Sequence, residues 1–321
     1  MISPATSLRN PAVELALRAE GNLEADVPVL KQHCANLLGI QVEPLDMPGA
    51  LARIRDALAT GSKGYICMAG VHGIMEAQRS LAVRCAFADS LMSLPDGMPT
   101  VWVGRLQGFT KMRRVAGPDL VLEVFRDRRL AHHSHFFYGG KPGVAEELAS
   151  NLKCRFPWVR IAGTYTPPFR DLNAGEERAL IAAVRQSKPS IIWVGISSPR
   201  QELFMRKYLP LLDTSLMFGV GAAFDFHTGR IRDCTEWIKR AGLQWLHRLV
   251  QDPRHLLWRY LRNNPAFLWR IILQMAGIHP APDCTPALPS QTRRPLLCHQ
   301  RAPKPCEIGS GCESPSASRL A

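Results

Sequence analysis

Polar residues that could take part in chemistry stand where apolar runs of this 321-residue chain give way to helical segments. The first is Asp96, which follows the run 90–94 in the tripeptide Pro95-Asp96-Gly97. A carboxylate held at the end of a strand is well placed to act as a general base. Asp-Gly is also a turn signal in its own right, and spacing alone favours the turn over the base.

A glycine-rich loop, Gly139-Gly140-Lys141-Pro142-Gly143, joins an aromatic run to a helix that we expect to start near Val144. Small residues let the backbone approach a ligand closely, and a helix N-terminus offers free N–H groups to an anion. Gly139, Gly140 and Lys141 are therefore candidates for phosphate binding. The loop has neither the dinucleotide pattern G-x-G-x-x-G nor the Walker pattern, and a plain turn explains it equally well.

Two further segments place polar side chains after apolar runs. In Ser197–Glu202, Ser198 can cap a helix that begins with Pro199, which puts Gln201 in the first turn beside any ligand at the strand ends. A capping segment with solvent-facing polar groups would look the same. Asp225 lies between two phenylalanines, and burying a carboxylate there costs several kcal/mol unless it is hydrogen-bonded. Asp225 is therefore a site candidate, with a structural cap as the alternative.

Metal and cofactor chemistry finds no support in the sequence. No Asp-x-Asp pair is present to hold a metal–diphosphate, and the ten histidines show no metal-ligand spacing. The histidine cluster at 132–135 is interpreted as an exposed loop and not as a metal site. The nine cysteines are odd in number and form no C-x-x-C, which argues against a disulfide framework and favours reduced thiols in a cytosolic protein. We expect neither a metal nor a cofactor.

Short β-like runs alternate with helical stretches between residues 35 and 228, which is typical of a parallel α/β sheet. The expected strands are 64–68, 90–94, 135–138, 159–163, 191–195 and 215–219, and the expected helices are 74–87, 175–186 and one from about 200. Several of the strands are apolar on both faces, as a sheet covered by helices on both sides requires. Ligands bind at the carboxyl ends of such strands, where the candidate residues stand.

The character of the chain changes between residues 229 and 278. This segment holds nine Lys and Arg against three Asp and Glu, and four of the seven tryptophans. We expect two or three helices without strands, in which arginines and tryptophans alternate with leucines. A basic amphipathic helix suits a membrane interface, and guanidinium groups also pair with phosphate oxygens. An ordinary packed helical subdomain accounts for the pattern equally well.

The formal charge of +13 favours anionic partners: nucleic acid, phospholipid headgroups or phosphorylated substrates. No run reaches the roughly 18–20 apolar residues of a transmembrane helix, and the N-terminus lacks a signal-peptide pattern, so we expect any membrane contact to be peripheral. Residues 1–34 are interpreted as a leader of uncertain order and residues 279–321, rich in Pro and Ser, as a disordered tail.

Taken together, these motifs resemble those of the WecG/TagA/CpsF glycosyltransferases, glycosyltransferase family 26. The resemblance covers about residues 60–275 and rests on motifs in the family's order at 94–99, 114–120, 136–144, 194–202, 219–226 and 242–265. It implies a Rossmann-like fold with a helical, membrane-associating appendage at 229–278. It also implies a UDP-sugar donor, an acceptor saccharide on a polyprenyl diphosphate and inversion at the anomeric carbon.

The resemblance assigns roles to individual residues of this chain. Asp96 would be the base that takes the proton from the acceptor hydroxyl. The expected donor-binding residues are Arg114, Gln201, Asp225 and the loop residues Gly139, Gly140 and Lys141. The expected contacts to the acceptor diphosphate and the membrane are Arg248, Arg254 and Arg259.

The resemblance further implies a place and a pathway class. We expect a cytoplasmic enzyme, peripheral on the inner face of the cell membrane and bound to its anionic surface, in the synthesis of a cell-surface polysaccharide such as exopolysaccharide, capsule, common antigen or teichoic acid. Nucleic acid is not expected as a partner. Homo-oligomer formation is left open.

One departure from the family pattern concerns the donor sugar. Many members carry Thr-x-Asn after the first strand, whereas this chain has Met68-Ala69-Gly70-Val71-His72-Gly73. His72 is the candidate to take the place of the missing side chains. The identity of the donor sugar is left open. The alternative function is a non-catalytic basic protein that binds nucleotides or nucleic acid. A dinucleotide-dependent oxidoreductase is a weaker alternative, because the fingerprint is absent.

Overall fold

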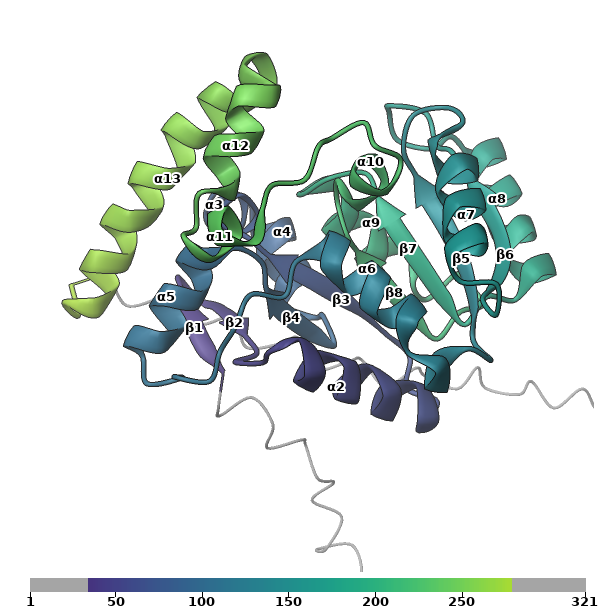
Figure 1. The fold of residues 1–321 in the computed structure, drawn as a ribbon, viewed down its shortest axis with the longest axis horizontal. Coiled ribbons are helices and arrows are strands. Elements are labelled where there is room, and N and C mark those ends of the chain that lie inside the picture. The colour runs from purple at the N-terminus through teal and green to yellow at the C-terminus, as the bar shows by residue number, and fades with distance from the viewer. Residues whose placement is uncertain (1–33, 279–321) are drawn as a thin grey trace, which may run out of the picture. The chain divides into compact units, whose positions relative to one another are not determined.

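The computed structural model describes residues 34–278, and Figure 1 shows how their strands and helices are arranged. The expected leader, apart from Cys34, and the expected tail at 279–321 lie outside the described residues.

A parallel sheet forms the centre of the described part, with the strand order β4-β3-β8-β7-β5-β6. Its strands are β3 (Gly64–Ala69), β4 (Met92–Pro95), β5 (Ser134–Gly139), β6 (Arg160–Tyr165), β7 (Ile191–Gly195) and β8 (Leu216–Gly219). Every neighbouring pair is parallel, so all carboxyl ends meet at one edge. The predicted α/β fold is thus confirmed, and each strand end lies within two residues of its predicted position.

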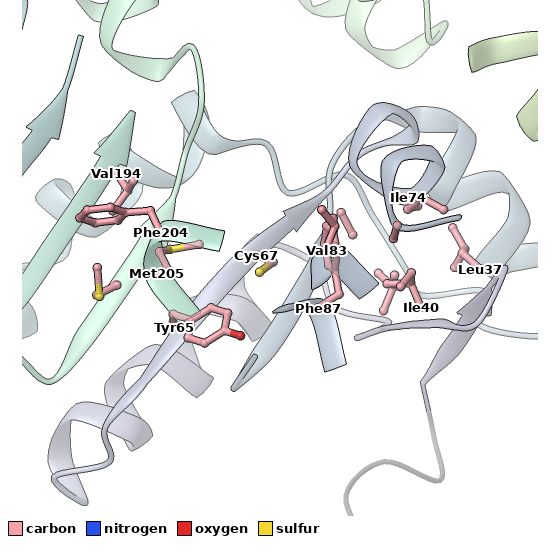
Figure 2. Packing of buried hydrophobic residues seen from close by; sticks show 14 of the residues in the cluster. Leu37, Ile40, Tyr65, Cys67, Ile74, Val83, Phe87, Val194, Phe204 and Met205 are labelled. Atoms are coloured by element: carbon pink, nitrogen blue, oxygen red, sulfur yellow. The ribbon is translucent and has the colours of Figure 1, made fainter. Parts of the chain in front are cut away.

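The side chains of one strand contribute to two separate hydrophobic cores, because successive residues face opposite sides of a sheet. Tyr65 and Cys67 of β3 join one core, whereas Ile66 joins the other. Figure 2 shows part of the first core, where Tyr65 and Cys67 lie between Phe204 and Phe87. A fully buried side chain of this size contributes about 1.5–3 kcal/mol. The apolar strands predicted from the sequence therefore hold the sheet between two helical layers.

Helices cover both faces of the sheet. The first core is lined by α3 (Val71–Arg79), α4 (Leu81–Ala88), α8 (Ala174–Ser187) and α9 (Arg200–Tyr208), and the second by α2 (Met47–Ala59), α6 (Gly117–Arg126), α7 (Val144–Arg155) and α10 (Ala223–His227). The single helix predicted at 74–87 was wrong. It is two helices, α3 and α4, that meet at Ser80, whose hydroxyl accepts from the Val83 N–H and caps the second helix.

A short antiparallel hairpin, β1 (Ala35–Leu37) and β2 (Ile40–Val42), was not predicted. Its two-residue turn places Leu38 at φ 54° and Gly39 at φ 87°. A short 3₁₀ turn, η2 (Arg128–Leu130), precedes β5. Neither element lies next to the cavities described below.

The segment after β8 and α10 forms helices α11 (Glu236–Arg240), α12 (Gln244–Gln251) and α13 (Pro253–Met275). Helices α12 and α13 lie side by side, and α13 packs on α3 (Figure 1). Phe267 and Ile271 of α13 join the first core, so this helix is anchored on the sheet domain. Among residues 34–278, no helix combines the length and the apolar character needed to cross a bilayer.

Candidate functional site

The candidate site lies where the carboxyl ends of β3, β4 and β8 meet. Strand β4 ends at Pro95, and Asp96 begins the turn that leads to α5 (Met98–Leu106). The Asp96 N–H donates to the Ala69 carbonyl at 3.4 Å, which ties this turn to the end of β3. A Cβ placed on Gly70 would lie 3.5 Å from Asp96 Oδ2. The glycine therefore leaves room for the carboxylate above the end of β3.

Two adjacent cavities meet at Asp96. The first, here named the sheet cavity, is lined by the strand-end loops, including Gly117, Ser198, Gln201 and Gly221. The second, here named the appendage cavity, is lined by Met98, Pro99, Trp245 and Tyr260. Six residues line both cavities: Gly70, His72, Asp96, Gln244, Arg248 and Arg259. The Asp96 carboxylate thus stands between a polar chamber and a more apolar, aromatic one.

Burial raises the pKa of Asp96 above its ordinary value of 3.8, and the positive charges of Arg114 and Arg248 oppose this rise. Within residues 34–278, no group donates a hydrogen bond to the carboxylate. A carboxylate that is desolvated and without a donor binds a proton more readily than an exposed one. These are the properties of a general base that is free to accept a proton from a substrate hydroxyl.

Gln201 holds one wall of the sheet cavity in place. Its side-chain amide donates to the Gly219 carbonyl and accepts from the Gly221 N–H, both at 3.0 Å. Buried Glu202 in turn accepts from the Gln201 amide at 3.1 Å and from the Ser198 hydroxyl at 2.6 Å. Burial raises the pKa of Glu202, while its bond to Ser198 lowers it. Gln201 therefore fixes the loop after β8, and its own orientation is fixed by Glu202.

The N-terminus of α6 also opens into the sheet cavity. The helix starts at Gly117 without a side-chain cap, and Gly117 lines the cavity. A Cβ at this position would lie 2.7 Å from the Val220 carbonyl oxygen, so only glycine allows the helix to approach the loop after β8 this closely. The first N–H groups and the positive end of the helix dipole suit an anion.

Arg114 lies on the appendage cavity, not on the sheet cavity. Its guanidinium pairs with Asp119 and donates to Gln244 at 3.2 Å. Asp119 also lies 3.8 Å from the buried Lys239, whose ammonium pairs with Asp233 at 2.6 Å. Lys239 also lines the appendage cavity, and it could not be predicted from the sequence because one lysine in a basic segment carries no distinguishing signal.

The three arginines expected at the diphosphate separate into two groups. Arg248 and Arg259 line both cavities, whereas Arg254 is exposed and lines neither. Among residues 34–278, the buried Nε of Arg259 has no hydrogen-bond partner. Burial lowers the pKa of Arg259, and the nearby charge of Arg248 lowers it further by a smaller amount. Two cations that line a cavity form an environment suited to a diphosphate.

His72 stands in the first turn of α3 and lines both cavities. Its Nδ1 lies 3.0 Å from the side-chain amide of Asn263 on α13, and the Ser198 backbone lies near the ring and opposes the lowering of its pKa. Burial, and next the charge of Arg259, lower the pKa of His72 to about 4. The imidazole is therefore neutral near pH 7 and bridges protein groups from three segments.

The loop residues Gly140 and Lys141 lie with Asp225 around a third cavity, next to Gly195 and Arg200. Lys141 and Asp225 also line a fourth cavity, which reaches Arg248. None of the three lines the two cavities that meet at Asp96. The structure therefore places these donor-site candidates farther along the same sheet edge, beside the sheet cavity, with which the third cavity shares Ser197.

Gly139 acts through the backbone alone. Its φ is 133°, and a Cβ there would lie 2.5 Å from the Gly195 carbonyl oxygen. The next residue, Gly140, donates its N–H to that carbonyl at 3.1 Å. This contact holds the ends of β5 and β7 together beside the third cavity. In the described part of the chain, no group of three or more His, Cys, Asp or Glu side chains could hold a metal ion.

Comparisons with known proteins show which family the sequence matches. Residues 35–279 match the sequence profile described as "Glycosyl transferase WecG/TagA/CpsF family". An N-acetylglucosaminyldiphosphoundecaprenol N-acetyl-β-D-mannosaminyltransferase of Bacillus spizizenii is 27% identical over 197 residues, which cover 61% of this chain and 74% of that protein. The protein of the same name from Bacillus subtilis is 29% identical over 170 residues, or 53% of this chain and 62% of that protein.

Proposed function

Because the chain belongs to the WecG/TagA/CpsF family and is a glycosyltransferase, we propose that it moves a sugar from a UDP-sugar onto a saccharide linked to polyprenyl diphosphate. The two Bacillus relatives are named for an acceptor of N-acetylglucosaminyldiphosphoundecaprenol, and we propose the same acceptor class for this chain. The product would enter a cell-surface polysaccharide.

The observation that carries this proposal is the position of Asp96 between two chambers of different chemistry. The sheet cavity offers the N-terminus of α6 and the Gln201-fixed loop, which suit the diphosphate and sugar of the donor. The appendage cavity offers Trp245 and Tyr260, whose rings lie 5.6 Å apart, edge to face. Aromatic side chains present apolar surface to the C–H face of a sugar. We therefore place the acceptor in the appendage cavity.

In the proposed reaction, Asp96 removes the proton from the attacking hydroxyl of the acceptor. That oxygen forms a bond to the anomeric carbon of the donor while the bond from this carbon to the diphosphate oxygen breaks. The configuration inverts because attack and departure occur on opposite faces. UDP leaves with the bonding electrons, and the N–H groups at the start of α6 stabilise its charge.

Arg248 and Arg259 are proposed to hold the diphosphate of the acceptor. Both lie on the wall shared by the cavities, so a diphosphate bound there would bring its sugar close to Asp96. Arg114 supports this wall through Gln244. The uridine is proposed to extend toward Lys141 and Asp225 in the third cavity.

We further propose that α12 and α13 attach the enzyme to the inner face of the cell membrane. Val250 is 76% exposed, Trp258 is 77% exposed and Trp269 is 61% exposed. Exposed arginines, including Arg254 and Arg262, stand among them. Apolar surface bordered by cations and tryptophans fits the headgroup region of an anionic bilayer. A lipid-linked acceptor would then be delivered beside the appendage cavity.

A transfer assay tests the proposed function. Purified chain is mixed with a panel of UDP-sugars, beginning with UDP-N-acetylmannosamine and UDP-glucose, and with a short-chain polyprenyl-diphosphate-linked N-acetylglucosamine. Mass spectrometry detects the extended lipid, and NMR gives the anomeric configuration. One UDP-sugar should yield a product with inverted configuration. A retained configuration, or transfer only to an acceptor without diphosphate, would contradict the proposal.

A further inference from the structure

Asn263 joins α13 to α3 through both ends of its side-chain amide. It is 3% exposed, although asparagine is a polar residue. Its oxygen accepts from Arg79 at 2.9 Å, so its nitrogen is the donor to His72 Nδ1 at 3.0 Å. A buried amide with both ends satisfied resists rotation, because each lost bond would leave a buried polar group unpaired.

The other side of His72 reaches a third segment. Since Nδ1 accepts from Asn263, the proton of the neutral ring is on Nε2, and the nearby Ser198 backbone favours the protonated ring. Close packing reinforces this link: a Cβ on Gly73 would lie 3.5 Å from the Ser198 hydroxyl. The chain Ser198–His72–Asn263 thus runs from the sheet cavity to α13.

Arg259 stands four residues before Asn263, one helical turn away on the same face of α13. The rotation of α13 about its axis therefore sets where the Arg259 guanidinium lies relative to the cavities. The rest of the helix is anchored elsewhere. Phe267 is buried in the first core, and Gln274 bonds to the backbone of Asn36 and Leu38, each at 2.8 Å.

We propose that His72 is a positioning residue that, through Asn263, holds Arg259 of the appendage in register with the Ser198 segment of the sheet cavity. The ligand whose binding it controls is a diphosphate at Arg248 and Arg259. This inference deepens the proposed function and rests on it for the identity of that ligand. It gives a role to the residue at which this chain departs from the Thr-x-Asn pattern.

The test measures inorganic pyrophosphate binding by calorimetry and acceptor kinetics on the full chain. His72→Ala should weaken pyrophosphate binding about tenfold and raise the acceptor KM similarly, with kcat changed less than threefold. Asn263→Leu should do the same, and the double variant should be no worse than either single variant. His72→Gln should restore binding to within about twofold, because the side-chain oxygen of a glutamine can accept from Asn263 as Nδ1 does.

Gln274→Ala is the matched control, since it removes a polar anchor of the same helix far from the cavities. The proposal predicts less than a twofold change in pyrophosphate binding for this variant. Equal weakening by Gln274→Ala, additive effects of His72→Ala and Asn263→Leu, or normal binding by His72→Ala would each overturn it. If His72→Ala fails to fold, Asn263→Leu and His72→Gln decide the question.

The same measurements separate this inference from the proposed function. A wild-type chain that binds pyrophosphate with the expected His72 dependence, but transfers no sugar, would overturn the proposed function and leave the positioning role standing. A chain that transfers sugar with unchanged acceptor KM in His72→Ala would overturn the positioning role alone. Failure of the wild-type chain to bind pyrophosphate would overturn the positioning role directly.

Discussion

Replacing Arg259 by methionine should make the protein more stable and its diphosphate site weaker. In the described part of the chain, the buried Arg259 Nε has no acceptor, and burial lowers the pKa of this guanidinium. An unsatisfied buried donor costs about 1–3 kcal/mol, and methionine has a similar length without that donor. We expect the free energy of unfolding to rise by about 1 kcal/mol. For a domain of this size, that change corresponds to a Tm increase of about 2–4 °C.

The effect of Arg259→Met on binding has the opposite sign. A hydrogen bond to a charged group contributes about 1.5–3 kcal/mol, so losing it should weaken pyrophosphate binding roughly 10- to 100-fold. Thermal unfolding with and without pyrophosphate measures both quantities. Arg254→Met is the control, because Arg254 lies on the same helix, is exposed and lines neither cavity. A destabilised Arg259→Met variant with unchanged pyrophosphate affinity would refute the reasoning.

Three further outcomes are expected. The ionised form of Asp96 is the base, and burial raises its pKa above 3.8. We therefore expect kcat/KM to fall as the pH drops through a value above 3.8. A pH profile whose acid limb lies at or below 3.8 would argue against this assignment. Gly139→Ala should lower the free energy of unfolding by at least about 2 kcal/mol in denaturant titrations, because its Cβ would lie 2.5 Å from the Gly195 oxygen at a φ of 133°. Replacing the exposed Trp258 and Trp269 by serine should reduce binding to anionic vesicles at least fivefold in flotation assays. Turnover of a water-soluble acceptor should not change. Unchanged flotation would exclude the surface that carries these tryptophans as the membrane contact.

The sheet could be predicted because most of its strands are short apolar runs, and four of them (β4, β5, β7 and β8) end at glycine or proline. Ile191–Gly195 was predicted to the residue, since an uninterrupted apolar run between polar segments leaves little choice of register. The break at Ser80 was missed because the apolar pattern continues across it. A capping serine inside an apolar stretch gives a weak signal in a single sequence.

The cavities could be predicted only in part. Asp96, Gln201 and Arg248 were named because each follows a recognisable motif, and all three line the sheet cavity. Lys239 and Asn263 were not found, because their importance depends on contacts with Asp119, His72 and Arg79 that are distant in sequence. Pairings of this kind are set by how α11 and α13 pack on the sheet domain.

The separation of Arg254 from Arg259 shows the same limit. Both are arginines of one basic helix, and the sequence suggests the same role for both. Only the docking of α13 on α3 turns Arg259 toward the cavities and leaves Arg254 exposed. Helical periodicity gives the angle between two residues, but it does not say which face meets a partner.

The most direct test of the account is the transfer rate of Asp96→Asn with the UDP-sugar identified by the panel. A general base contributes about 100- to 10,000-fold, so this variant should lose at least 100-fold in kcat. The variant should keep its pyrophosphate affinity. Its Tm should not fall, because the buried Asp96 opposes folding when it is ionised above its raised pKa, and asparagine carries no charge. A variant that folds, binds pyrophosphate and transfers sugar at near the wild-type rate would contradict the central claim that Asp96 is the base.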